Sequence, residues 1–278
     1  MKIVKRKLFI GLAAVMLFLL LMAFPFGPLL PWSPIKPGYN AASYAHADVY
    51  FSNRETLPDD YRQMDQMMAE AEAFHGLKFH HRVKVIACKS WGDCQRSWFW
   101  MNVKPLGGVT LGTGDAIYIT PKLMEKKFSI AEFLRHELSH AVISQNTTIR
   151  NSMKLTDQAW FSEGIAVWFG NQTSYFSQAE FLEKAKTSDL AKAIDPAQMD
   201  RNSPDWSWRF AYPAQRYFLE YLKQTHGKDR FQSFLEQYIQ APDDYQKQFR
   251  DVFQQSLTDA IRQFEQAIKS GEWPRNTQ

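Results

Sequence analysis

The sequence predicts an α+β fold in which a small mixed sheet packs against one central helix and a helical C-terminal subdomain follows. Residues 78–88 alternate apolar and polar side chains, and residues 109–111 and 116–120 form short apolar runs near glycines, as strands do. Residues 129–142 repeat apolar side chains at helical spacing. Further along, aromatic residues recur at helical intervals, which indicates a helical core. We expect helices there over residues 177–186, 213–224, 228–240 and 243–269.

The central helix begins at a clear N-terminal signal. Ser129 is a candidate N-cap, and Glu132 three residues later completes a capping box. Phe128 and Phe133 occupy the two positions of a hydrophobic staple, which fixes how the chain enters the helix. The face expected to be buried consists of Ile130, Phe133, Leu134, Leu138, Ala141 and Val142.

This helix contains an H-E-x-x-H sequence, from His136 to His140. Residues four apart lie on one side of a helix, so the two imidazoles converge and can bind Zn²⁺ at roughly 2.0–2.1 Å each. Glu137 can face the open position of the metal and take a proton from bound water as general base. Such a motif arises by chance in about one chain in a hundred of this length, so a third ligand is needed to strengthen the assignment.

Residues 159–170 form a second apolar segment of helical character, which ends at Gly170, a residue suited to a helix C-terminus. Glu163 lies inside it, and burying a carboxylate there is unfavourable unless it is paired or bound to a metal. Gly164 would let this helix approach the first one closely, after a polar loop over residues 145–154. We therefore expect Glu163 to be the third zinc ligand. The alternative is a surface glutamate on a half-exposed helix.

The two histidines, the glutamate between them and a downstream W-x-x-E-G-x-A sequence resemble the gluzincin zinc metallopeptidases, within the broad peptidase MA-like family. The resemblance covers residues 115–221 and implies a zincin-like fold. It implies His136, His140 and Glu163 as ligands of Zn²⁺, Glu137 as general base, and a peptide or protein as substrate.

Two features of the better-known gluzincin branches are missing. The aminopeptidase branch carries a G-x-M-E-N sequence that anchors a free amine, and none precedes the central helix. The thermolysin branch has an aspartate four residues after the third ligand, and that position is Val167 here. The substrate specificity of neither branch can therefore be carried over to this chain.

The resemblance also implies two parts of a substrate cleft. In gluzincins the strand before the metal helix is a free edge that binds an extended peptide, and residues 116–120 match that strand. In the MA-like family a tyrosine near the start of a later helix supports the tetrahedral intermediate. Tyr212, followed by Pro213 as the first helical residue, matches it best. The alternatives are Tyr217, Tyr221 and His226.

The N-terminal residues indicate a membrane anchor. Four basic residues among the first seven precede the uncharged residues 8–24, a run that is short for a membrane-spanning helix and slightly long for a signal-peptide core. A small-residue cleavage site occurs only near residue 45, so we expect an uncleaved signal anchor over residues 1–26. The alternative is a signal peptide that is removed.

The basic cluster places the N-terminus in the cytoplasm. The protein would then be single-pass in the plasma (inner) membrane, with its catalytic part facing the periplasm or the extracellular space. Prolines at every third position from residue 25 to residue 37 predict a polyproline II spacer over residues 27–47, with a docking site for a proline-reading partner as the alternative. The metallopeptidase-like domain is expected over residues 48–272. Its sheet and metal helix would take residues 48–145, and its helical part residues 146–272.

Several side chains outside the motif have simpler explanations. Cys88 and Cys94 are the only cysteines, and on the outer side of a membrane they can close a small disulfide loop. His80 and His81 are neighbours on an expected strand and point to opposite faces, so we do not expect them to be ligands.

The net charge of +4 comes with no stripe of Lys or Arg, which excludes nucleic acid as an expected partner. The oligomeric state stays open.

Together these features predict a membrane-anchored zinc peptidase, most specifically an endopeptidase. It would hydrolyse peptide bonds through a zinc-activated water with Glu137 as general base. A second class stays open, namely a non-catalytic tethered module that keeps the zincin fold and captures extended peptides. The presence of Glu137 favours the enzyme.

Overall fold

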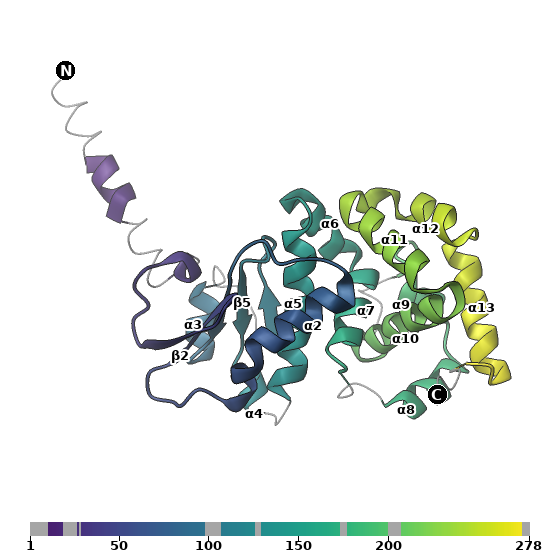
Figure 1. Cartoon of the computed structure of the whole chain (residues 1–278), viewed down its shortest axis with the longest axis horizontal. Coiled ribbons are helices and arrows are strands. Elements are labelled where there is room, and N and C mark those ends of the chain that lie inside the picture. Colours follow the sequence, from purple (N-terminus) through teal and green to yellow (C-terminus); the bar gives the residue numbers. More distant parts are fainter. Residues whose placement is uncertain are drawn as a thin grey trace, which may run out of the picture.

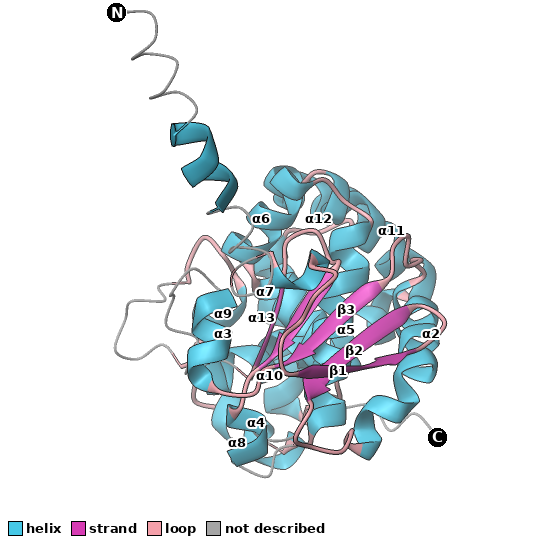
Figure 2. Cartoon of the chain, turned by 90° about the vertical axis from the view of Figure 1, so that its left-hand side faces the viewer, coloured by secondary structure: helices cyan, strands magenta, loops and turns pink. Residues whose placement is uncertain are grey.

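The computed structural model describes residues 11–18, 27, 29–97, 107–125, 129–172, 177–199 and 207–273. A five-stranded sheet lies at one end of the folded body and a group of helices at the other (Figure 1). Viewed from the sheet end, the strands lie in front of the C-terminal helices (Figure 2). The chain therefore has the mixed α+β architecture that the sequence predicts.

The sheet is mixed, with its strands in the order β1-β2-β3-β5-β4. They are β1 (Tyr39–Ser43), β2 (Ala47–Ser52), β3 (Val83–Ala87), β4 (Gly108–Thr110) and β5 (Ala116–Ile119). β2, β3 and β5 are parallel, whereas β1 and β4 run antiparallel to their neighbours. β1 was not predicted from the sequence. This strand lies within residues 27–47, so that part of the expected spacer is paired with the sheet.

One face of the sheet packs against helices α5 (Ile130–Gln145) and α2 (Met64–His75), the latter preceded by the 3-10 turn η2 (Asp59–Gln63). Ile117 and Ile119 of β5 lie in this core, while Tyr118 between them faces the other side of the sheet. That side is covered in part by the 3-10 turn η1 (Leu30–Trp32). The alternation fixes which face of the sheet meets α5.

Helix α5 starts where its sequence predicts. The Ser129 hydroxyl accepts a hydrogen bond from the backbone N–H of Glu132, which confirms the N-cap. The expected hydrophobic staple includes Phe128, which lies outside the described residues. The apolar positions of α5 are buried as predicted, among them Leu134 and Leu138 at 0% exposure.

Cys88 and Cys94 form a disulfide, with their Cα atoms 5.5 Å apart. The bridge joins the end of β3 to helix α3 (Trp91–Ser97). No free cysteine remains in the sequence, and a cysteine-based metal site is excluded. The small loop suggested by the spacing of the two cysteines is confirmed.

The remaining helices form a second core rich in aromatic side chains. They are α6 (Ile149–Gln158), α7 (Trp160–Phe169), α8 (Gln178–Ala185), α9 (Ala191–Ile194), α10 (Trp208–His226), α11 (Lys228–Gln240), η3 (Pro242–Asp244), α12 (Tyr245–Phe253) and α13 (Leu257–Ser270). The short helix α4 (Lys122–Glu125) is not among them, because its Leu123 lies in the core between the sheet and α5. Phe218, Phe234 and Phe264 are fully buried in this core. The aromatic repeat therefore supplies packing, as expected.

Three expectations about this helical part are wrong. Residues 149–158 form α6, where the sequence suggested a polar loop, because Thr148 caps the N–H of Asn151 and starts a helix. Pro213 does not open a helix: α10 begins five residues earlier, after Ser207, and accommodates the proline within its second turn. The single helix expected over residues 243–269 is broken at Gln254, whose φ of 59° ends α12 before α13 begins.

Of the expected anchor, the structure describes only residues 11–18, which are helical. None of the described helices is both long and apolar enough to cross a bilayer.

His75 of α2 is fully buried and makes two hydrogen bonds, one within its own helix and one to α5. Its Nδ1 lies 2.8 Å from the carbonyl oxygen of Ala71, which can only accept, so Nδ1 carries the proton. Its Nε2 then accepts from the hydroxyl of Ser139, also at 2.8 Å. Burial lowers the pKa of His75 to about 4, so the ring is neutral in the folded protein.

This buried imidazole predicts a loss of stability in acid. In the unfolded chain His75 binds a proton near pH 6.5, whereas the folded protein resists protonation down to about pH 4. The free energy of unfolding should therefore be fully maintained above pH 6.5 and fall by about 3 kcal/mol between the two values. Urea unfolding of metal-free wild type and His75→Gln across this range measures the effect. If the free energy of unfolding fell equally steeply with pH in the two proteins, the prediction would be contradicted.

Candidate metal centre

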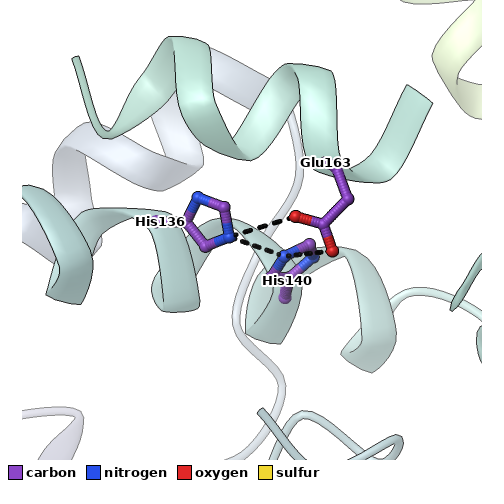
Figure 3. Close-up of side chains that lie close together, drawn as sticks. All are labelled: His136, His140 and Glu163. Atoms are coloured by element: carbon purple, nitrogen blue, oxygen red, sulfur yellow. Dashed lines mark hydrogen bonds and ion pairs between the residues drawn. The ribbon is translucent and has the colours of Figure 1, made fainter. Parts of the chain in front are cut away.

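The two histidines of the H-E-x-x-H sequence converge as predicted (Figure 3). His136 and His140 lie one turn apart on α5, and their Nε2 atoms are 3.1 Å from each other. Their side chains are only 8% and 20% exposed. Two nitrogen donors thus face one point on the side of the helix that is turned toward α7.

Glu163 of α7 completes the group from the opposite side. One of its carboxylate oxygens is 3.4 Å from Nε2 of His136, and the other is 3.7 Å from Nε2 of His140. Figure 3 shows the carboxylate pointing at the imidazole pair. The alternative of a surface glutamate is excluded, since the side chain is 20% exposed and aimed at the histidines. The structure therefore brings together all three residues expected to bind the metal.

The spacing of these atoms fits a zinc ion. Ligand atoms bound tetrahedrally at roughly 2.0–2.1 Å lie about 3.3 Å from one another. The observed separations of 3.1, 3.4 and 3.7 Å bracket that value. Two imidazole nitrogens and one carboxylate are also a donor set that Zn²⁺ uses in catalytic sites, with a fourth position left open. The residues present therefore fit the ion.

The electrostatics of the group favour a cation. Burial opposes the charge of Glu163, yet the adjacent His140 and His136 keep the pKa of this carboxyl well below its usual range. Burial also opposes the charge of His140, but Glu163 nearby raises the pKa of that imidazole. A bound divalent ion would stabilise the same carboxylate and leave both imidazoles neutral.

Glycines hold α7 between two neighbouring helices. A Cβ on Gly164 would lie 2.9 Å from the Cβ of Gln215 on α10, so this glycine permits close contact with α10, not with α5 as the sequence analysis expected. On the α5 side, a Cβ on Gly170 would lie 2.8 Å from the carbonyl oxygen of Glu132. Gly170 has a φ of −65°, so its small size matters rather than a left-handed conformation. Both contacts fix the position of Glu163 relative to the histidines.

Glu137 faces the sheet from the same helix and is 4% exposed. The Thr110 hydroxyl of β4 donates to Oε2 of Glu137 at 2.7 Å and also lies 3.0 Å from its carbonyl oxygen. A Cβ on Gly108 would come within 2.8 Å of Oε1. Neither Gly108 nor Thr110 was identified from the sequence as part of the site. The signal available in the sequence was their spacing, because residues two positions apart on a strand lie on the same face.

Among the described residues, the edge strand of the sheet beside the metal helix is β4. The expectation that residues 116–120 form this edge is wrong, because β5 lies between β3 and β4. Two backbone hydrogen bonds flank β4: Thr120 N–H donates to the Gly107 carbonyl, and Leu111 N–H donates to the Ala116 carbonyl. In an antiparallel pair the backbone groups of alternate residues face the partner strand, so the odd-numbered residues here, including Val109, face β5. The backbone groups of Gly108 and Thr110 therefore point away from β5, on the side that has no neighbouring strand among the described residues.

Tyr212 lies in the second turn of α10, half-buried, with its ring 6.4 Å from that of Trp208. Two of its alternatives face the aromatic core, since Tyr217 and Tyr221 are 4% and 8% exposed. His226 lies at the far end of α10 and pairs with the side chain of Gln255. The role of Tyr212 stays a prediction.

One polar atom near the metal ligands has no assigned partner. Nδ1 of His136 is buried and makes no hydrogen bond to the residues that the structure describes. Metal-binding histidines usually donate this N–H to an acceptor that orients the ring. The sequence left these supporting residues unidentified, and the described part of the chain does not supply one for His136.

Comparisons with known proteins give matches only at the level of structure. No family model matches the sequence, and no curated protein does. Among solved structures, the chain is similar to an M1 zinc metallopeptidase from Deinococcus radiodurans, with a TM-score of 0.42 and 14% identity. It is similar also to a two-domain M1 zinc metallopeptidase, in a mutant form bound to L-arginine, with a TM-score of 0.44 and 14% identity. Each match covers 83% of this chain, which spans about half (51%) of either neighbour.

Removal of either type of ligand should abolish tight zinc binding. Wild type should hold one zinc per chain, whereas His140→Ala and Glu163→Ala should bind it roughly 100-fold more weakly or worse, since even supporting residues cost 10- to 100-fold. Metal analysis after dialysis against a weak chelator measures the stoichiometry. His81→Ala, an exposed histidine away from the group, is the matched control and should retain the metal. Full zinc occupancy in Glu163→Ala would contradict the assignment.

Proposed function

We propose that this chain is a zinc-dependent peptidase and, more specifically, an endopeptidase. The observation that supports it is the convergence of two imidazole nitrogens and a carboxylate next to a buried Glu137, beside an open strand edge. A structural zinc site would have four protein ligands, whereas three ligands with a nearby carboxylate are typical of hydrolytic sites.

Each residue of the group has a defined task. His136, His140 and Glu163 would hold the ion, and zinc, when bound, supplies Lewis acidity that lowers the pKa of water and polarises a carbonyl. The Glu137 carboxylate accepts a proton from the attacking water and returns it to the leaving amine. We assign Tyr212 to support of the developing oxyanion, because its hydroxyl is the candidate on α10 that is not buried in the aromatic core.

The edge strand suggests the class of substrate. An extended peptide can add to β4 through the outward-facing backbone groups of Gly108 and Thr110, which places its amide bonds beside Glu137. Enzymes that remove terminal residues need a charge opposite to the chain end. Residues 107–111 carry none, so the segment next to the general base favours internal bonds.

A blocked peptide substrate tests the proposal. Wild type loaded with zinc should cleave an unfolded protein, and also a peptide blocked at both ends, at internal bonds. Glu137→Gln should retain its zinc and lose roughly 10²- to 10⁴-fold in kcat, the usual contribution of a general base. Chromatography with mass detection of the fragments measures both. Equal turnover by the two proteins, or none by either at full zinc occupancy, would favour the non-catalytic peptide-binding module.

We further propose that the chain is anchored in the plasma (inner) membrane with the peptidase domain outside. The described part of the N-terminal apolar segment is a helix whose side chains are exposed, with Leu12 at 65% and Phe18 at 61%. The disulfide between Cys88 and Cys94 suits an oxidising compartment. Intact-mass analysis of the membrane-extracted protein should give the uncleaved chain. A mass that starts near residue 48 would contradict the anchor.

A further inference from the structure

Thr110 makes the closest polar contact to the general base that the structure describes. Its hydroxyl is 2.7 Å from Oε2 of Glu137. Both residues are shielded from solvent, Thr110 partly and Glu137 almost fully. A threonine hydroxyl has one hydrogen to donate, and an ionised carboxylate oxygen is a stronger acceptor than the carbonyl oxygen at 3.0 Å. The hydroxyl therefore donates to the carboxylate.

The same strand restricts the other carboxylate oxygen. Gly108 lies two residues before Thr110, on the same face of β4, and a Cβ there would contact Oε1 and Cγ of Glu137 at 2.8 Å. With Oε2 held by the hydroxyl and Oε1 lying over the glycine, the carboxylate has one favoured orientation. A glutamate has three side-chain torsions, so without such contacts it would populate several rotamers.

We propose that Thr110 is a positioning residue, which holds Oε2 of Glu137 by a hydrogen bond and leaves Oε1 as the oxygen that takes the proton from water. The inference depends on the proposed peptidase function. Thr110 also presents its backbone to the open edge of the sheet, so the residue that orients the base lies on the strand that would bind the substrate. Loss of the hydroxyl should leave that backbone, and hence substrate binding, in place.

Two substitutions separate the hydroxyl from the shape of the side chain. Thr110→Val keeps the shape and removes the donor, and Thr110→Ser keeps the donor. In zinc-loaded protein, Thr110→Val should lower kcat roughly 10- to 100-fold with KM and zinc content unchanged, because a misplaced catalytic group costs rate rather than binding. Thr110→Ser should recover most of the rate. Thr156→Val, which removes a hydroxyl bonded to the Ser152 carbonyl on α6, should stay at the wild-type rate.

A stability measurement without metal tests the contact itself. Urea midpoints of metal-free wild type, Thr110→Val, Glu137→Met and the double variant form a cycle. The shift caused by Thr110→Val should be smaller in the Glu137→Met background, where the carboxylate acceptor is gone. Equal shifts in both backgrounds would mean that Thr110 acts only through the Glu137 carbonyl, and would overturn the proposal.

The outcomes distinguish this proposal from the function on which it depends. An inactive wild type at full zinc occupancy refutes the peptidase assignment and with it the role of Thr110. An active wild type, an inactive Glu137→Gln and a fully active Thr110→Val refute only the positioning role. A Thr110→Ser variant as slow as Thr110→Val would also refute it, because the hydroxyl would then have no part in the rate.

Discussion

The close packing of α7 between α5 and α10 is the constraint on which the metal centre depends. Gly164 admits α10 and Gly170 admits α5, so the helix that carries Glu163 is held from both sides. Trp160 and Ile165 of the same helix are fully buried in the helical core. A carboxylate is unfavourable in these surroundings unless it is paired with a positive charge. A metal ion bound by the imidazole pair of α5 would supply that charge.

Helix α5 connects the two halves of the fold. Leu134 and Leu138 pack against the sheet, while Val142 and Ile143 belong to the aromatic core of the C-terminal helices. The metal ligands face α7, and Glu137 on an adjacent face meets β4. The proposed site is therefore located where the two cores meet, and each core positions a different part of it: the helices hold Glu163, and the sheet contacts Glu137.

The residues of the candidate metal centre could be predicted to lie together because their signals are local. An N-cap, a helical repeat and a spacing of four placed His136 and His140, and a carboxylate in an apolar helix indicated Glu163. The edge of the sheet could not be predicted in this way, since strand order depends on pairing between segments far apart, and β5 proved to be internal. Thr110 was missed for the same reason, because its contact with Glu137 joins a strand to a helix 27 residues away.

Zinc-edge anomalous diffraction from crystals of the zinc-loaded protein tests the central claim most directly. One anomalous peak should lie roughly 2.0–2.2 Å from Nε2 of His136, Nε2 of His140 and a carboxylate oxygen of Glu163, with Glu137 close by but not bound. A peak elsewhere, or a Glu163 side chain turned away from the two imidazoles, would contradict the account.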